Sequence, residues 1–268
     1  MGKSDRGLPR NSTPSVRPYS ALAPLYDQIM AHVDYDRWAA YLVSLCRRFG
    51  KPPRRTLELG CGTGNLTFPL SSELGGSYLA TDYSDEMLEV ARKKPESVGK
   101  NVQFETADFR CLQMNGVFDL IVLAYDGVNY LVEQEEVIRL LEGVAWRLDR
   151  GGIFLFDQTT PANSINNLAY FDDRWESDDA SYVRSSHYDV DRHLHTTRFD
   201  VRIGGKRAHE VHFQRAYDLA EMELMLKLSS FRVDGCLDAF SLAPATDQSE
   251  RIQWVLSMPN LPTNTATG

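Results

Sequence analysis

The chain has 268 residues, 43% of them hydrophobic and 25% charged, and a formal net charge of −8. This composition is that of a globular protein able to bury its own core, and the negative charge disfavours a general nucleic-acid partner. The cysteines, Cys46, Cys61, Cys111 and Cys236, form no CxxC pair, which argues against a disulfide framework or a zinc site and favours a reducing cytoplasm.

The two ends of the chain lack the pattern of a folded core. Residues 1–18 combine Gly, Ser, Pro and Arg without an apolar run, which predicts a disordered arm and not a signal peptide. Residues 259–268 are expected to fray. No segment approaches the ~18 apolar residues that a membrane span needs, so no membrane partner is expected. The basic run at 47–55 is interpreted as a solvated helix end and linker, with a binding patch as the alternative.

Strand and helix signals alternate between residues 34 and 158. An amphipathic helix is predicted over 34–49, where apolar residues recur at helical spacing. The predicted strands are 56–60, 77–84, 102–109, 118–126 and 153–158, and the predicted helices between them are 65–74, 84–94 and 135–148. Ser84 is the expected N-cap of the 84–94 helix. This alternation predicts a doubly wound, mostly parallel α/β sheet.

The pattern changes after residue 160. Alternating segments at 181–190, 193–203 and 208–217, with Gly204-Gly205 between the last two, predict a small antiparallel sheet inserted after the fifth strand. A helix is expected to begin at Asp218, which forms a capping-box pattern with Glu221. A final antiparallel pair at 231–240 and 251–258 brings the main sheet to seven strands. The main domain is therefore expected to comprise 19–160 and 218–258, and the insertion 161–217.

The stretch LELGCGTGN places Gly60, Gly62 and Gly64 at every second position after a predicted strand. Such a turn lets the backbone approach a nucleotide at the carboxyl ends of parallel strands. A dinucleotide fingerprint, GxGxxG, would need a third glycine where this chain has Asn65, and the loop lacks the lysine of a P-loop. A carboxylate such as Asp82, at the end of the next strand, can accept hydrogen bonds from ribose hydroxyls.

These motifs together resemble those of class I S-adenosylmethionine-dependent methyltransferases, in the correct order over residues 56–158. The resemblance implies a Rossmann-like fold in which Asp82 binds the ribose, Met87 packs on adenine and Asp108 faces the adenine amino group. Glu58 would either support the glycine loop or contact the methionine amine. The implied cofactor is S-adenosylmethionine, with S-adenosylhomocysteine as product. The implied cofactor-binding residues are Tyr26, Tyr35, Glu58, Gly60, Cys61, Gly62, Gly64, Asp82, Tyr83, Met87, Ala107, Asp108, Phe109, Leu123 and Ala124.

The segment 21–38 is similar to the lead-in of a small-molecule subgroup that includes sugar-amine N-methyltransferases and glycine N-methyltransferase-like enzymes. By this resemblance, Tyr26 and Tyr35 would close over the methionine end of the cofactor; alternatively, both rings only pack the first helices onto the sheet. The inserted sheet is similar to the roof of the acceptor pocket in that subgroup. His193 and His195 are two residues apart and are expected on one strand face, where a solvated face is favoured over a zinc site. Of His209 and His212, at most one is expected to face the pocket.

We therefore expect an enzyme that transfers a methyl group by in-line displacement to a small-molecule acceptor, in the first instance an amine. The alternatives are O- or C-methylation of a small metabolite, a non-catalytic S-adenosylmethionine or S-adenosylhomocysteine binder, and a nicotinamide-dependent oxidoreductase. An acidic pocket formed through Asp126 would suit a cationic or amine substrate. The oligomeric state is left open, with a homodimer as one option. The candidate catalytic residues are Tyr125, Asp126, Asn129, His187 and Arg215, and Tyr130 is a further candidate for the acceptor site.

Overall fold

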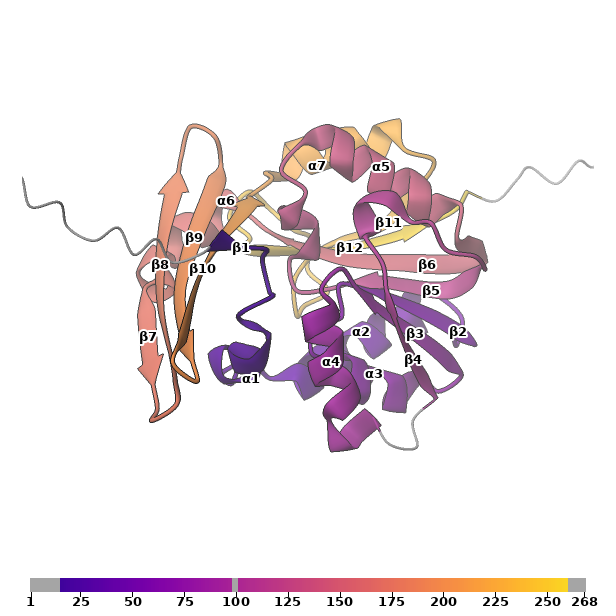
Figure 1. The fold of residues 1–268 in the computed structure, drawn as a ribbon. Helices are drawn as coiled ribbons and strands as arrows, with labels where there is room; N and C mark the ends of the chain where they lie inside the picture. The colour runs from indigo at the N-terminus through magenta and orange to yellow at the C-terminus, as the bar shows by residue number, and fades with distance from the viewer. Residues whose placement is uncertain (1–14, 98–100, 260–268) are drawn as a thin grey trace, which may run out of the picture.

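The computed structural model describes residues 15–97 and 101–259 and contains two separate β-sheets (Figure 1). The expectations for residues 1–14 and 260–268 lie outside the described residues. The strands are β1 (Ser15–Val16), β2 (Arg55–Leu59), β3 (Ser77–Asp82), β4 (Val102–Thr106), β5 (Phe118–Leu123), β6 (Leu148–Thr159), β7 (Asp173–Glu176), β8 (Ala180–Asp189), β9 (Leu194–Ile203), β10 (Lys206–Arg215), β11 (Arg232–Asp238) and β12 (Arg251–Ser257). The α-helices are α1 (Tyr26–Ile29), α2 (Tyr35–Phe49), α3 (Thr67–Leu74), α4 (Asp85–Lys93), α5 (Gln134–Ala145), α6 (Pro161–Asn166) and α7 (Leu219–Leu228).

The seven-stranded sheet has the order β11-β12-β6-β5-β2-β3-β4. The strand pairs from β6 to β4 are parallel, while β12 is antiparallel to both of its neighbours. Helices cover both faces: α5 and α7 lie on one side, and α2, α3 and α4 on the other (Figure 1). The predicted fold class, a doubly wound and mostly parallel seven-stranded sheet with an inserted antiparallel sheet, is confirmed.

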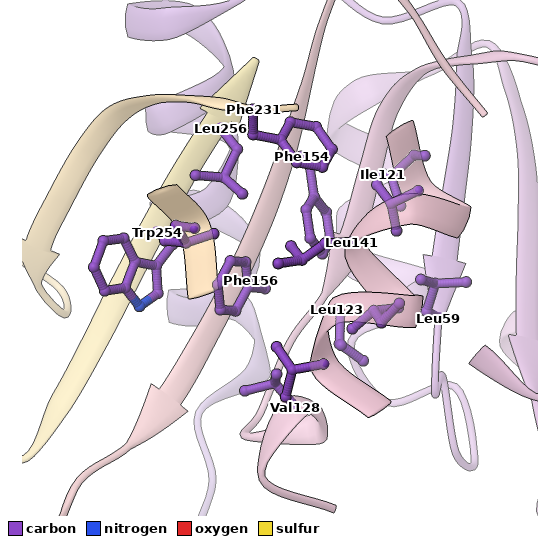
Figure 2. Packing of buried hydrophobic residues seen from close by; sticks show 14 of the residues in the cluster. Leu59, Ile121, Leu123, Val128, Leu141, Phe154, Phe156, Phe231, Trp254 and Leu256 are labelled. Carbon is purple, nitrogen blue, oxygen red and sulfur yellow. The ribbon is translucent and has the colours of Figure 1, made fainter. Parts of the chain in front are cut away.

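Alternating strand residues divide the core between the two faces of this sheet. Leu57 and Leu59 belong to the cluster that packs against α5 and α7, and Leu120 and Val122 to the cluster that packs against α2 and α3. Figure 2 shows the first cluster, where aromatic rings from β6 and β12 meet. Phe156 stacks on Phe154 and on Trp254, with ring centroids 5.2 Å and 6.2 Å apart. This packing holds β12 against β6, and β6 carries polar residues of the site near its carboxyl end.

The five-stranded sheet, in the order β1-β10-β9-β8-β7, lies beyond one end of the larger sheet, with α1 between the two (Figure 1). Ser15 and Val16 were expected to be disordered together with residues 1–14, but they pair in parallel with His209 and Glu210 of β10. The prediction was wrong at these two positions because β10 would be the edge of the sheet without β1 and offers it backbone partners, which local composition does not reveal.

Two other local predictions also need correction. The 161–217 insertion was predicted as an antiparallel sheet, yet Pro161–Asn166 forms α6, with Pro161 at its first turn and the Thr160 hydroxyl accepting from the Asn163 amide. A six-residue helix is too short to show a helical period. His193 does not share a strand face with His195, because it lies in the turn before β9 with φ +51°.

The predicted helix starts at Ser84 and Asp218 are confirmed. The Ser84 hydroxyl accepts from the Met87 amide, and Asp218 and Glu221 form a capping box at α7. Of the helices in the described ranges, none is long and apolar enough to cross a membrane.

Candidate active site

The glycine loop after β2 needs the conformational freedom of its three glycines. Gly60, Gly62 and Gly64 have φ values of +67°, +56° and +79°, a region that side-chain-bearing residues rarely adopt. A Cβ added to Gly60 would lie 3.6 Å from Phe109, and one added to Gly62 would lie 3.5 Å from Met87. Phe109, which follows β4, and Met87, on α4, are therefore apolar neighbours of the loop, the kind of side chain that a flat nucleoside base packs against.

Asp82 ends β3 directly beside this loop. One carboxylate oxygen accepts from the Gly62 amide at 2.8 Å, and the other accepts from the Ser84 amide at 2.8 Å. Burial raises the pKa of Asp82, while these backbone donors oppose the rise. Each oxygen keeps a second lone pair for a ligand hydroxyl. The loop and the carboxylate together fit the ribose end of an adenosyl group.

Asp108 and Tyr83 lie on the side predicted to hold adenine, and an arginine joins them. The Arg110 guanidinium hydrogen-bonds both oxygens of Asp108, the shortest at 2.8 Å, and lies 5.2 Å from the centroid of the Tyr83 ring. Ala107 follows β4, and its amide donates to the carbonyl oxygen of Asp82. Both oxygens of the Asp108 carboxylate are therefore already hydrogen-bonded to Arg110, a contact that the sequence did not suggest.

Glu58 is buried beneath the loop, on the face that packs against α3. Its carboxylate accepts from the Thr67 hydroxyl at 2.7 Å and from the Tyr78 hydroxyl at 2.9 Å. Burial raises the pKa of Glu58 to about 7, and the two hydroxyl donors oppose this rise. These contacts connect β2, β3 and α3, and they support the structural role among the two roles that the sequence left open.

Because the pKa of Glu58 is raised, the folded protein holds this proton to a higher pH than the unfolded chain does. The contribution to stability is complete below about pH 4.5 and is lost as the pH rises to about 7, a fall of roughly 3 kcal/mol. We expect Glu58→Gln to flatten the dependence of the unfolding free energy on pH across this window, as measured by urea denaturation. Equal slopes for the parent and the variant would contradict this account.

The N-terminal segment is attached to the glycine loop by Asp27, which sequence reasoning did not include among the site residues. Its carboxylate accepts from the Thr63 hydroxyl at 2.6 Å and from the Asn65 amide at 2.9 Å, and it pairs with Lys94 at 2.8 Å. Tyr26 is consequently held beside Gly62, where its ring would lie 3.9 Å from an added Cβ.

A cavity of about 360 Å³ lies between the N-terminal segment, the turn after β5 and the inserted sheet. Tyr125, Asp126 and Asn129 line this cavity, as predicted for acceptor-site residues, and so do Tyr130 and His212. Its other lining residues are Tyr19, Leu22, Tyr26, Ile29, Met30, His32, Thr159, Asn163, Asn167, Tyr170, Arg184, His195, Thr197, Phe199, Gln214, Ala216 and Arg251.

The turn at Tyr125 and Asp126 has positive φ at both residues, +60° and +52°. The buried carboxylate of Asp157, on β6, accepts from both backbone amides at 2.6 and 3.0 Å and so holds this turn. Arg251, from β12, bonds both Asp157 and Asp126, the latter at 2.9 Å. Gln214 also donates to Asp126 at 2.8 Å. Asp126 is therefore ion-paired, but Arg251 is shared with Asp157, so one cation faces two carboxylates and the acidic pocket expected through Asp126 stays a prediction.

Asn129 is fully buried and has a supporting position. Its side-chain amide donates to the carbonyl oxygens of Thr159 and Arg215, and its oxygen accepts from the Thr159 amide. These three bonds join the turn after β5 to β6 and to the end of β10. They leave little capacity for a substrate, so the contacts of Asn129 are those of a residue that positions the cavity wall.

The structure does not bring His187 or Arg215 to the cavity. His187 is exposed on β8, because its neighbour Tyr188 takes the inward position of the alternating strand. Arg215 pairs with Glu221 at 2.6 Å and lies over the Tyr217 ring. His193 lies close to Asp218 and Glu221, and these three side chains could together offer ligands to a metal ion. Glu221 is already bonded to Arg215 and forms the capping box with Asp218, so these contacts account for the cluster without a metal.

The principal residues that sequence reasoning missed are Tyr19 and Glu210. Tyr19 adopts φ +64°, and its ring packs edge-on against the imidazole of His212 at 4.7 Å. Glu210 is fully buried and accepts from the backbone amides of Tyr19, Ala21 and Leu22. A charged residue in an alternating strand, two positions before a histidine, was the signal available in the sequence.

The comparisons with known proteins agree with this geometry. Residues 56–152 match the family described as a methyltransferase domain. The chain is 32% identical over 242 residues to YqeM of Bacillus subtilis, named as a methyltransferase, and the match covers 87% of this chain and 94% of that protein. A crystal structure of an S-adenosylmethionine-dependent methyltransferase from Clostridium acetobutylicum has a TM-score of 0.75 at 27% identity, covering 90% and 99% of the two chains. CalS10, an amino pentose methyltransferase from Micromonospora echinaspora solved with bound S-adenosylmethionine, shares the fold with a TM-score of 0.65 at 16% identity, covering 88% and 97%.

The doubly wound sheet, with a glycine loop after its first parallel strand and a carboxylate at the end of the second, defines a Rossmann-like fold. The chain belongs to the class I S-adenosylmethionine-dependent methyltransferases of the small-molecule type. It is therefore an enzyme, and S-adenosylmethionine is its cofactor. The predicted family, enzyme class and cofactor are confirmed.

Proposed function

We propose that this methyltransferase methylates an amine nitrogen of a small metabolite held in the 360 Å³ cavity. The observation that carries the proposal is the set of aromatic rings on the cavity wall. The lining tyrosines are Tyr19, Tyr26, Tyr125, Tyr130 and Tyr170. The faces of such rings attract an ammonium group, because the ring quadrupole presents negative charge to it.

The charges of the cavity wall are compatible with a cationic acceptor. Arg184 pairs with Asp173 at 2.8 Å, and Arg251 is paired with Asp126 and Asp157. Both guanidinium groups that line the cavity are thus balanced by carboxylates. An incoming ammonium group would meet no uncompensated positive charge from either arginine.

The proposed role of each residue follows from its position. S-adenosylmethionine supplies an activated methyl group whose bond to sulfur breaks with the electron pair left on sulfur. The glycine loop and Asp82 are proposed to hold the nucleoside, with Met87 and Phe109 against its base. Tyr26 contacts both the space at the loop and the cavity, so it is proposed to align the two ligands. Such alignment is the main contribution that this class of reaction requires.

One of the solved relatives methylates an amino sugar. CalS10 is an amino pentose methyltransferase, and its likeness covers 88% of this chain. Because its identity to this chain is only 16%, the likeness supports the fold and not a particular acceptor. Methylation of an oxygen or a carbon atom would contradict the proposal.

Acceptors with similar carbon skeletons but different nucleophilic groups test which atom is methylated. The purified chain would be incubated with S-adenosylmethionine carrying a ¹³C methyl group and with glucosamine or glucose, and in parallel with tyramine, which offers both an amine and a phenol. We expect ¹³C on nitrogen in glucosamine and tyramine and no transfer to glucose, as read by NMR of the products. Transfer only to the phenol oxygen, or to carbon, would contradict the proposal.

A further inference from the structure

A row of hydrogen-bonded side chains leads from the cavity into the buried interior of the inserted sheet. The Tyr19 and Tyr130 hydroxyl groups are bonded to each other, and the Tyr130 hydroxyl lies 3.0 Å from Nδ1 of His212. On the other side of the ring, Nε2 lies 3.1 Å from a carboxylate oxygen of Glu210. His212 is 2% exposed and Glu210 is fully buried, whereas Tyr19 and Tyr130 are partly exposed, so the row becomes more buried from the tyrosines to the carboxylate.

We propose that Tyr19, Tyr130, His212 and Glu210 form a proton relay that deprotonates the acceptor before methyl transfer. The inference rests on the proposed function, since an amine enters as an ammonium ion, whose lone pair is blocked by its proton. The acceptor proton passes to the Tyr19 oxygen, the Tyr19 proton to the Tyr130 oxygen, and the Tyr130 proton to Nδ1 of His212. One proton is gained by the imidazole, the acceptor becomes neutral, and Glu210 faces the imidazolium that results.

The surroundings of Glu210 fix the direction of this relay. Its carboxylate accepts from the backbone amides of Tyr19 at 2.7 Å, Leu22 at 3.0 Å and Ala21. These donors orient the carboxylate so that the remaining partner, Nε2 of His212, donates to it. With the proton on Nε2, Nδ1 is left as an acceptor for the Tyr130 hydroxyl. The arrangement follows the logic of a base that is held in one tautomer by a carboxylate.

Tyr19 lies where the relay has to begin. Its backbone carbonyl accepts from Ser84, next to the ribose-binding Asp82, while its ring lines the acceptor cavity. Burial raises the pKa of both Tyr19 and Tyr130, so both hydroxyls keep their protons near neutral pH and can pass a proton on. Tyr19 has a positive φ, which is a strained conformation for a tyrosine. The hydrogen bond from its backbone amide to the Glu210 carboxylate holds it in this conformation.

Other titratable and charged groups face the same space and must be considered in any pH profile. They are Tyr26, His32, Tyr125, Asp126, Tyr170, Arg184, His195 and Arg251. Asp126 and both arginines are ion-paired, and burial lowers the pKa of His195. Within the described ranges, His212 is the lining imidazole that is bonded to both a tyrosine and a carboxylate.

The kinetic test uses tyramine as the acceptor, because its amine is almost wholly protonated at pH 7, and compares kcat/KM for methylation of its nitrogen across pH. We expect His212→Gln to lower kcat/KM by about 100-fold at pH 7 and to approach the parent above the pKa of the acceptor amine, where no deprotonation is needed. Tyr130→Phe, which removes one oxygen and keeps the packing, should show the same pH-dependent loss. Tyr182→Phe, which removes a phenol of the inserted sheet outside the cavity, is the matched control. An equal loss at every pH would show a purely structural role and overturn the relay.

A second measurement needs no turnover. In ¹⁵N-histidine-labelled protein without cofactor, we expect His212 to carry its proton on Nε2, and Tyr130→Phe to shift the Nδ1 resonance toward that of a nitrogen without a hydrogen bond. A proton on Nδ1 would overturn the relay even if glucosamine is methylated. If His212 has the expected tautomer but only hydroxyl acceptors are methylated, the proposed amine acceptor is wrong. The relay is then supported, with the acceptor hydroxyl as the proton donor.

Discussion

Replacing Asp82 with alanine is expected to weaken the binding of S-adenosylhomocysteine by about 100-fold, measured by calorimetry. In our assignment the carboxylate accepts from both ribose hydroxyls, and hydrogen bonds to a charged group contribute roughly 1.5–3 kcal/mol each. The variant also frees the Gly62 and Ser84 amides, which Asp82 now binds at 2.8 Å, so the glycine loop loses its support on the ligand side. Both effects act in the same direction.

Asp85 provides the control, because it is an exposed carboxylate three residues further on that hydrogen-bonds Thr106. Asp85→Ala should leave the affinity for S-adenosylhomocysteine within about twofold of the parent, since a surface carboxylate contributes little. Comparable affinities for Asp82→Ala and the parent would remove Asp82 from the nucleoside site and with it the proposed assignment of the glycine loop.

Replacing Arg251 with methionine is expected to destabilise the fold by about 3–5 kcal/mol, because it leaves two carboxylates in the protein without their cation. Asp157 is fully buried, and Asp126 has only Gln214 as its remaining side-chain partner. Burial raises the pKa of Asp157 and Arg251 opposes that rise, so loss of the cation should raise it further. Part of the lost stability should return as the pH is lowered and Asp157 becomes protonated.

The measurement is urea denaturation of the parent and the variant at pH 5 and pH 8. Lys93→Met is the matched control, since Lys93 pairs with Glu89 at 3.5 Å on the surface of α4 and both side chains are mostly exposed. Its cost should be below about 0.5 kcal/mol. If the Arg251 variant is no less stable than this control, the buried ion pairs do not hold the turn at Tyr125 and Asp126.

The glycine loop and its neighbours could be predicted because their signals are local. Gly60, Gly62 and Gly64 directly follow an apolar strand, and Asp82 ends the next one, so parallel pairing brings them to the same edge of the sheet. The capping residues Ser84 and Asp218 were predictable for the same reason, since each bonds a residue three positions away.

The polar network around the cavity could not be predicted in this way. Arg251 meets Asp126 across 125 positions of the chain, and Glu210 meets Tyr19 across 191. Neither pair has a sequence pattern, because such contacts depend on how β12 and β10 are placed against segments far away in the chain. The ion pair of Asp126 with Arg251 was missed for this reason.

The sequence by itself determined the order of strands and helices, the nucleoside loop and the carboxylate beside it, because each depends on residues a few positions apart. Only the tertiary structure decided which face of each inserted strand meets the cavity. Alternation defines two faces of a strand and does not say which one is inward. His187 points outward and His212 inward because the inserted sheet packs over the N-terminal segment and the turn after β5, and that packing is a property of the whole chain.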